Sequence, residues 1–271
     1  MRCCMLAFWS NVMFSLAASA QVLYIGGTTY SQNFDTLANN PVNANITWVD
    51  DSTLPGWYEH KVGGTNSAAL TDLYRANSGN STQGHLYSFG SASSTDRALG
   101  SLASGATGTV FFGVRLPNHH ATWVLTSFTV EFTMEQWRSG NRNDPPDRTF
   151  FEYKVSTAET DIHGTGYTAN SAGDLVAVNS SGTGAIDGNL ASNRSSVSFT
   201  VTGIVWNPGE DLWLRWRDPD NSSADQGMGI DDFQFTAVPE PASMMLVGLG
   251  LGLAATFGLK HRRRSSLNQS V

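Results

Sequence analysis

Cysteine is almost absent from this chain of 271 residues, and both copies, Cys3 and Cys4, stand at its very start. Small secreted domains usually rely on disulfides, because their cores are too small to hold them together. The rest of the chain has no cysteine, so we expect a domain that is large enough to be stabilised by its core alone. The same absence excludes a cysteine nucleophile.

Basic residues are also scarce: 16 Lys and Arg stand against 23 Asp and Glu, for a net charge of −7. Between residues 21 and 237 the imbalance grows to 11 basic against 22 acidic residues, about −11, because that span leaves out one acidic and five basic residues: Glu240, Arg2, Lys260, Arg262, Arg263 and Arg264. Nucleic-acid binding requires a basic surface. Nucleic acid is therefore excluded as a partner.

Familiar catalytic patterns are missing as well. The chain has no Gly-x-Ser-x-Gly elbow, and its histidines lack the short spacings of zinc sites, so we expect no local zinc motif at His60, His85, His119, His120 or His163. Glu131 and Glu135 are four residues apart, which on one straight strand separates their Cα atoms by about 13 Å. Glycosidases hold their two carboxyl groups at about 5 to 9.5 Å. We therefore expect a protein that is not an enzyme.

The first twenty residues have the layout of a secretory signal peptide. Arg2 precedes an apolar run over residues 5–18, which Ser10 and Asn11 interrupt, and Ala18-Ser19-Ala20 is a small-x-small cleavage pattern. We expect residues 1–20 to be removed and the mature chain to start at Gln21.

The C-terminal segment combines a proline-rich turn, an apolar run and a basic cluster. Val238, Pro239, Glu240 and Pro241 precede the uncharged residues 242–259, and Lys260, Arg262, Arg263 and Arg264 follow. Eighteen residues of helix extend about 27 Å, which just spans a hydrocarbon core of about 30 Å. Positive flanks stay cytoplasmic. We expect a transmembrane helix over 242–259, a basic stop over 260–264 and a cytoplasmic tail over 265–271.

This arrangement over residues 238–264 resembles the PEP-CTERM sorting signal of Gram-negative bacteria. The resemblance implies that exosortase and the export machinery are partners. It also implies that the protein is anchored in the inner membrane with a periplasmic ectodomain, and that processing then delivers it to the cell surface or the exterior. A permanent single-pass anchor, with the prolines acting only as a helix stop, is the alternative.

Residues 21–237 predict one all-β domain. Apolar and polar residues alternate in several short segments, so that one face of each strand meets a core and the other meets water. No segment shows a helical period over twelve residues. We expect a jelly-roll-like two-sheet sandwich; a parallel β-helix would need a sequence repeat, which is not found. The expected strands are 109–115, 127–135, 149–156, 197–201, 212–216 and 230–235.

An acidic loop lies between the last two of these strands. Asp218, Asp220, Asp225, Asp231 and Asp232 repel one another unless hydrogen bonds or a cation compensate, and Ca²⁺ binds oxygen ligands on loops of this kind. They are candidate Ca²⁺ ligands, although Asp231 and Asp232 point to opposite faces if both lie in a strand. The alternative is an acidic turn whose carboxylates accept backbone N–H groups.

The same region carries a second resemblance. Residues 214–218 read Leu-Arg-Trp-Arg-Asp and residues 227–233 read Gly-Met-Gly-Ile-Asp-Asp-Phe. This ending resembles a group of PEP-CTERM proteins that end in Gly-x-x-Ile-Asp-Asp-Phe, and it is similar to the closing strand of MAM-type jelly rolls. Further elements similar to that group are residues 32–37, 97–102, 135–138 and 186–189. The resemblance implies a jelly-roll sandwich.

Surface tryptophans are how many β-sandwich modules stack on sugar rings. Trp57 follows a Pro-Gly turn and Trp137 breaks the alternation expected of core positions, so both are candidate ligand platforms. The PEP-CTERM resemblance goes with exopolysaccharide-producing bacteria. Together with the missing catalytic patterns, it implies an exported surface or extracellular-matrix protein that binds exopolysaccharide. The alternative is a secreted polysaccharide hydrolase with a carboxylate pair assembled from distant strands.

Overall fold

A computed structural model describes residues 29–140, 147–180, 182–221 and 224–239. The expected signal peptide, transmembrane helix and basic stop lie outside these residues. Within them, no helix is long and apolar enough to cross a membrane. The one α-helix among them, α1 (Ser67–Leu70), is a single turn.

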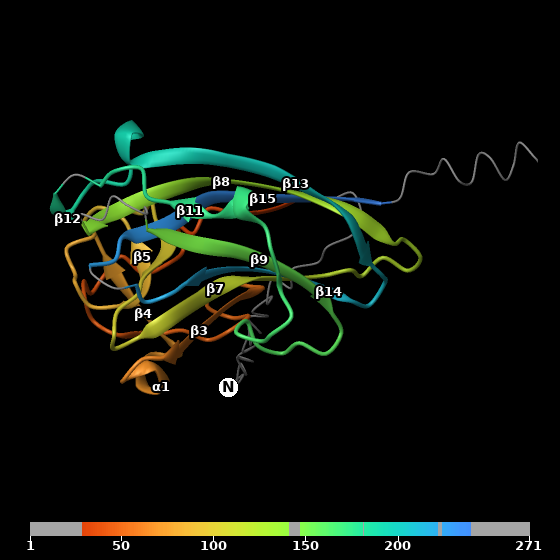
Figure 1. The fold of residues 1–271 in the computed structure, drawn as a ribbon, viewed down its shortest axis with the longest axis horizontal. Helices are drawn as coiled ribbons and strands as arrows, with labels where there is room; N and C mark the ends of the chain where they lie inside the picture. Colours follow the sequence, from red (N-terminus) through yellow and green to blue (C-terminus); the bar gives the residue numbers. More distant parts are fainter. Residues whose placement is uncertain (1–28, 141–146, 181, 222–223, 240–271) are drawn as a thin grey trace, which may run out of the picture.

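The described residues form two β-sheets that pack face to face (Figure 1). The nine-stranded sheet runs in the order β12 (Thr183–Ala185), β8 (Leu125–Gly140), β15 (Gly227–Pro239), β6 (Ala98–Leu102), β5 (His85–Phe89), β4 (Leu73–Asn77) and β2 (Ile46–Thr47); β13 (Arg194–Trp206) pairs with β8 and β1 (Thr29–Gln32) with β15. The six-stranded sheet runs β10 (Thr168–Ala169), β9 (Arg148–Ser156), β14 (Asp211–Asp218), β7 (Gly108–Pro117) and β3 (Trp57–Gly63), and β11 (Leu175–Val176) pairs with β9. The predicted all-β two-sheet sandwich is confirmed.

Each of the six strands expected from alternation is present, as β7, β8, β9, β13, β14 and β15. The sequence pattern did not predict β5 and β6, because every residue of these two strands is buried. One side of them faces the core between the sheets. The other side faces a small separate cluster that includes Tyr87, Phe89 and Trp137. A strand that is buried on both faces has no polar positions to alternate with apolar ones.

Aromatic side chains pack together at the centre of the sandwich, where the sequence has no cysteine for a disulfide. The ring of Trp216 is fully buried between the sheets and stacks on Trp57, with 6.4 Å between ring centroids, and on Phe112, at 5.7 Å. Phe132 and Phe233 of the opposite sheet meet it edge-on. The indole N–H of Trp216 donates to the carbonyl of Gly173 at 3.1 Å, so its one polar group is satisfied.

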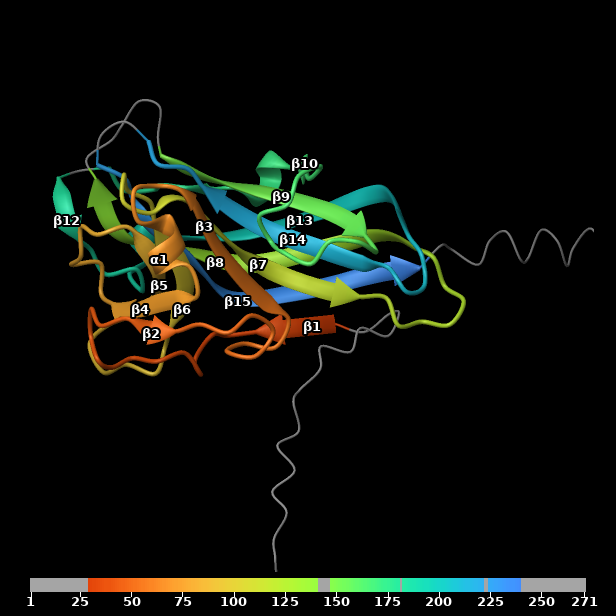
Figure 2. The same cartoon turned by 90° about the horizontal axis from the view of Figure 1, so that it is seen from below.

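The closing strand β15 extends further than the expected domain boundary at residue 237. Val238 pairs with Ser127 and Pro239 with Leu125, so the first two residues of the Val-Pro-Glu-Pro motif belong to the sheet. β1 pairs with β15 only as far as Thr236, and a proline at the end of a strand removes no ladder hydrogen bond on that side. The C-terminal segment therefore starts directly from a strand of the sandwich, beside β1 (Figure 2).

Candidate functional site

The outward sides of β13, β8, β15 and β1 form an uncovered polar surface, which we call the polar face. Its side chains lie in register across the four strands, because each outward residue pairs with an outward residue of the next strand. One row is Thr200, Thr129, Thr236 and Thr29, and the next is Ser198, Glu131, Gln234 and Ser31. Six of the eight are exposed and the other two are half-buried.

Hydrogen bonds across the strands organise part of this surface. The hydroxyls of Thr129 and Thr200 lie 2.8 Å apart, and the Ser198 hydroxyl donates to Glu131 Oε1 at 3.0 Å. Inward neighbours such as Phe128, Val130 and Phe132 are buried in the core. The polar face is therefore a rigid array held by the packing beneath it.

An open hollow of about 450 Å³ adjoins the polar face. A β-bulge shapes it: the register between β15 and β8 shifts after Asp231, and Asp232 adopts a left-handed conformation with φ of 49°. The backbone N–H of Asp232 donates to Asp231 Oδ1 at 2.7 Å, which supports the bulge. The hollow is lined by Ser31, Gln32, Asn33, Asp232, Phe233 and Gln234.

Two buried carboxyl groups continue the same side of the sheet beyond the polar face. Burial, reinforced by nearby acidic groups that include Asp96, raises the pKa of Glu135 to about 7 and the pKa of Asp231 to about 8. The indole N–H of Trp137 donates to Glu135 Oε2 at 2.9 Å. Glu135 is 2% exposed and Asp231 7% exposed, so both lie beneath the surface.

The expectation that Trp57 and Trp137 are ligand platforms does not fit their positions. Trp57 is fully buried, because the chain after the Pro-Gly turn enters β3 directly and the ring packs between the sheets. Trp137 is 1% exposed, because the segment around Gly188 covers its ring so closely that a Cβ on Gly188 would lie 2.4 Å from it. Neither ring offers a face to a sugar.

Trp123 is the tryptophan that does reach solvent in the described part of the chain, at 44% exposure. It lies in the loop before β8, where the imidazole of His120 stacks on one side of its ring at 3.9 Å. His120 Nδ1 accepts the backbone N–H groups of Thr122 and Trp123, which hold the imidazole in place. Part of the indole ring is therefore open to solvent.

The five candidate Ca²⁺ ligands fall into two groups. Asp218 and Asp225 lie near one another and near Asp147, and burial together with these neighbouring carboxylates raises the pKa of each to about 8. Asp220 acts on Asp225 and belongs with them. Asp231 and Asp232 instead lie with Glu135 and Asp96 at the bulge of β15. Asp147 was not predicted, since it comes from a distant part of the chain.

Several carboxylate oxygens of the first group already accept hydrogen bonds. Asp147 Oδ1 accepts the Asn221 side-chain amide at 2.6 Å, and Asp147 Oδ2 accepts the backbone N–H of Gln226 at 2.8 Å. Asp218 Oδ2 accepts the Ser101 hydroxyl at 2.7 Å. The cluster therefore has features of both expected alternatives, the oxygen-rich cation site and the acidic turn that caps backbone groups.

Comparison with known proteins finds a match for the C-terminal segment. Residues 237–264 match the PEP-CTERM protein-sorting motif. The PEP-CTERM motif implies an exported protein that exosortase processes. The matched range includes the Val-Pro-Glu-Pro tetrapeptide at 238–241 and the basic cluster at 260–264. No curated protein matches the sequence.

Several solved structures are similar to this chain. The CBM22-1 xylan-binding domain of Xyn10C from Paenibacillus barcinonensis is 9% identical, with a TM-score of 0.33, over 81% of this chain and 100% of that one. The K3 cleaved adhesin domain of Lys-gingipain from Porphyromonas gingivalis is 12% identical, with a TM-score of 0.37, over 71% and 98%. TmCBM61, solved with β-1,4-galactotriose, is 12% identical, with a TM-score of 0.26, over 53% and 72%. At these scores the likenesses carry no argument for a shared ligand.

Proposed function

We propose that this PEP-CTERM chain is a non-enzymatic surface or extracellular-matrix protein of the jelly-roll type that binds a neutral exopolysaccharide through the polar face. Residues 242–259 hold it in the inner membrane until exosortase processes it. The observation that carries the proposal is the polar face itself: two registered rows of hydroxyl, amide and carboxylate groups beside a hollow of about 450 Å³.

The chemistry of these groups suits a carbohydrate. Sugar hydroxyls both donate and accept hydrogen bonds, and Ser, Thr, Asn and Gln side chains do the same. A hollow of this size lies within the range of small-ligand sites, about 300–1,000 Å³. Rigid strands hold the groups in place, so little ordering entropy opposes binding.

The charge of the polar face favours a neutral polysaccharide over an acidic one. The ionisable groups of the two rows and of the hollow are Glu131 and Asp232, both acidic; Arg194 lies further along the same side of β13, and the whole chain has a net charge of −7. Like charges repel a polymer of uronic acids as it approaches. A neutral polysaccharide meets no such barrier.

Trp123 gives a second contact of the kind that sugars use. Its solvent-exposed indole can stack on the apolar face of a sugar ring, and His120 stacks on one side of it. Trp123 lies two residues before Leu125, which pairs with Pro239. It therefore belongs to the end of the sandwich from which the sorting motif leaves.

A polysaccharide hydrolase is the second candidate function, and the raised pKa values of Glu135 and Asp231 favour it. Asp231 pairs with Thr133, so it is the diagonal neighbour of Glu135, and the two Cα atoms lie about 7–8 Å apart. Their burial argues against hydrolysis. Carboxyl groups that are 2% and 7% exposed do not meet a polymer lying on the surface.

Calcium is part of the proposal, bound by Asp218, Asp220 and Asp225 together with Asp147. Carboxylate oxygens are the ligands that Ca²⁺ prefers. A cation would relieve the cost of ionising Asp218 and Asp225, whose pKa values burial and mutual repulsion raise to about 8. We expect Ca²⁺ to raise the melting temperature and a chelator to reverse the gain. An unchanged melting curve would leave the cluster as an acidic turn.

The test of the main proposal uses the purified full chain in detergent and immobilised polysaccharides. We expect retention on neutral polymers such as dextran, cellulose or xylan, and none on alginate, a polymer of uronic acids. Release of reducing ends during the same incubation would support the hydrolase instead. Lack of retention on any neutral polymer, including the exopolysaccharide of the producing cell, would contradict the proposal.

A further inference from the structure

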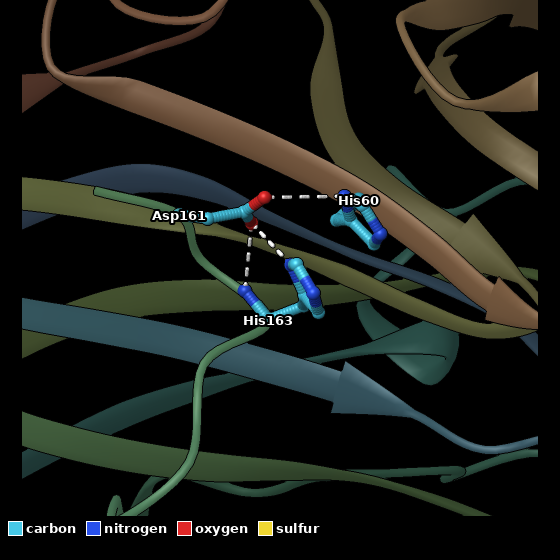
Figure 3. Close-up of side chains that lie close together, drawn as sticks. All are labelled: His60, Asp161 and His163. Carbon is cyan, nitrogen blue, oxygen red and sulfur yellow. Dashed lines mark hydrogen bonds and ion pairs between the residues drawn. The ribbon is translucent and has the colours of Figure 1, made fainter. Parts of the chain in front are cut away.

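The loop between β9 and β10 brings Asp161 and His163 onto the outer side of β3, where both meet His60 (Figure 3). His60 Nδ1 lies 3.5 Å from Asp161 Oδ2, and His163 Nδ1 lies 2.6 Å from Asp161 Oδ1. One candidate ligand atom from each of the three residues lies within 4.8 Å of the others. The three side chains are 24% to 39% exposed, so an ion from solvent can reach them.

The loop that supplies two of these residues is firmly attached to the six-stranded sheet. Ile162, between Asp161 and His163, is fully buried in a cluster with Tyr58, Phe111 and Trp213. Arg215 Nη1 donates to the carbonyls of Ile162 and Gly164, at 2.9 and 2.7 Å. Sites whose ligands are held by buried neighbours need little reorganisation to bind.

Hydrogen bonding also orients the carboxylate. Asp161 Oδ1 accepts the backbone N–H of His163 at 3.0 Å and lies 2.6 Å from His163 Nδ1. This leaves Oδ2 directed toward His60 (Figure 3). The carboxylate therefore lies beside the pair of imidazoles, with one oxygen near each ring.

Negatively charged groups around His60 favour a cation. Asp72 and Asp161 add negative potential at His60. The ammonium of Lys61 is occupied by Glu59, at 2.5 Å, and by the carbonyl of Leu73. The site therefore places two imidazoles in an acidic setting with no free Lys61 ammonium beside them.

We infer that His60, Asp161 and His163 bind one divalent transition-metal ion, of which Zn²⁺ is the representative, with water completing the coordination. Two imidazoles and one carboxylate form a ligand set typical of Zn²⁺, whereas Ca²⁺ prefers six to eight oxygens. The ion fastens the β9–β10 loop to β3, two segments about 100 residues apart in the chain.

Binding requires a defined local change. Around a tetrahedral ion with bonds of about 2.1 Å, ligand atoms lie about 3.4 Å apart. The separation between His60 Nδ1 and Asp161 Oδ2, 3.5 Å, is close to this value, while the 2.6 Å contact between His163 Nδ1 and Asp161 Oδ1 must lengthen. The two imidazoles stack at 3.7 Å and 13° from parallel, so the His163 ring must turn away for both lone pairs to converge.

Titration calorimetry of the untagged full chain, stripped with EDTA, tests the inference with ZnCl₂ as the probe at pH 7.5. We expect one high-affinity ion per chain, binding at least 10-fold weaker at pH 5.5, and a melting temperature several degrees higher with Zn²⁺. Excess CaCl₂ should not displace the ion. In place of Zn²⁺, Co²⁺ should give visible d–d absorption.

Substitutions of single histidines test which residues bind the ion. His60→Gln and His163→Gln should each weaken Zn²⁺ binding at least 10-fold, and the second change should leave folding intact because His163 is exposed. His119→Gln, an exposed histidine in the β7–β8 loop, is the matched control and should bind as the unmodified chain does. Near-UV circular dichroism verifies that each variant is folded. Zn²⁺ affinity that is unchanged in both His60→Gln and His163→Gln, or no Zn²⁺ binding by the unmodified chain, would overturn the inference.

Discussion

Asp218 is the buried carboxyl group whose substitution tests the electrostatic account most sharply. It is the last residue of β14, is 1% exposed, and accepts the Ser101 hydroxyl at 2.7 Å. Burial is the main cause that raises its pKa from 3.8 to about 8, and the nearby Asp147 adds to the effect. Asp218→Asn keeps the size of the side chain and an oxygen that can accept from Ser101, and it removes the ionisation.

The sign of the effect follows from proton linkage. Between pH 3.8 and pH 8 the folded chain holds a proton on Asp218 that the unfolded chain has released. The stability is therefore fully present below pH 3.8 and falls by about 1.4 kcal/mol per pH unit as the pH rises through this window. From pH 4 to pH 7 the loss reaches up to about 4 kcal/mol. Asp218→Asn has no ionisable group at this position, so the variant does not show this loss of stability.

Thermal melts in EGTA, followed by tryptophan fluorescence from pH 4 to pH 8, measure this difference. We expect the variant to match the unmodified chain at pH 4 and to melt up to roughly 10 °C higher at pH 7. Asp220→Asn changes an exposed carboxyl in the same loop and should keep the pH dependence of the unmodified chain. Ca²⁺ should stabilise the unmodified chain more than Asp218→Asn. If Asp218→Asn has the unmodified slope, or melts lower at pH 7 without Ca²⁺, the reasoning is refuted.

Two further substitutions test the packing. Lys61→Met should lower the free energy of unfolding in urea by about 3–5 kcal/mol, because it leaves the fully buried Glu59 carboxyl without its partner at 2.5 Å. Adding Glu59→Gln to Lys61→Met should restore most of this free energy. If the losses from the two substitutions add instead, the pairing is contradicted. Gly100→Ala should prevent folding, measured by the loss of near-UV circular dichroism, because its Cβ would lie 2.1 Å from the carbonyl oxygen of Met228 on the adjacent β15. A folded Gly100→Ala chain with unchanged stability would show that β6 and β15 are further apart than described here.

The sequence predicts those strands that have one solvent-exposed face and one buried face. In β8 the polar positions Thr129 and Glu131 alternate with buried Phe128, Val130 and Phe132, and the strand is found where the pattern predicts it. β5 and β6 have no such pattern, because loops and Trp137 cover their outer side. Local alternation reports exposure, and exposure depends on what the rest of the chain places on each face.

The candidate sites depend even more on distant parts of the chain. The exposure expected for Trp57 rested on a local Pro-Gly turn, but Phe34 and Phe233 come from the two ends of the domain to enclose its ring. His60 lies far along the chain from Asp161 and His163, as Asp147 does from Asp218 and Asp225, so no local motif links them. Only the pairing of strands shows that Thr29 and Thr236 belong to one row.

The central claim is that a neutral polysaccharide lies on the polar face, and calorimetric affinity for the best-retained polymer tests it most directly. Gln234→Ala and Ser31→Arg alter the polar face and its hollow, while Thr168→Arg adds the same bulk and charge at an exposed residue of the other sheet. We predict at least 10-fold weaker binding for both polar-face variants and unchanged binding for Thr168→Arg. Equal affinity in all three variants would contradict the account.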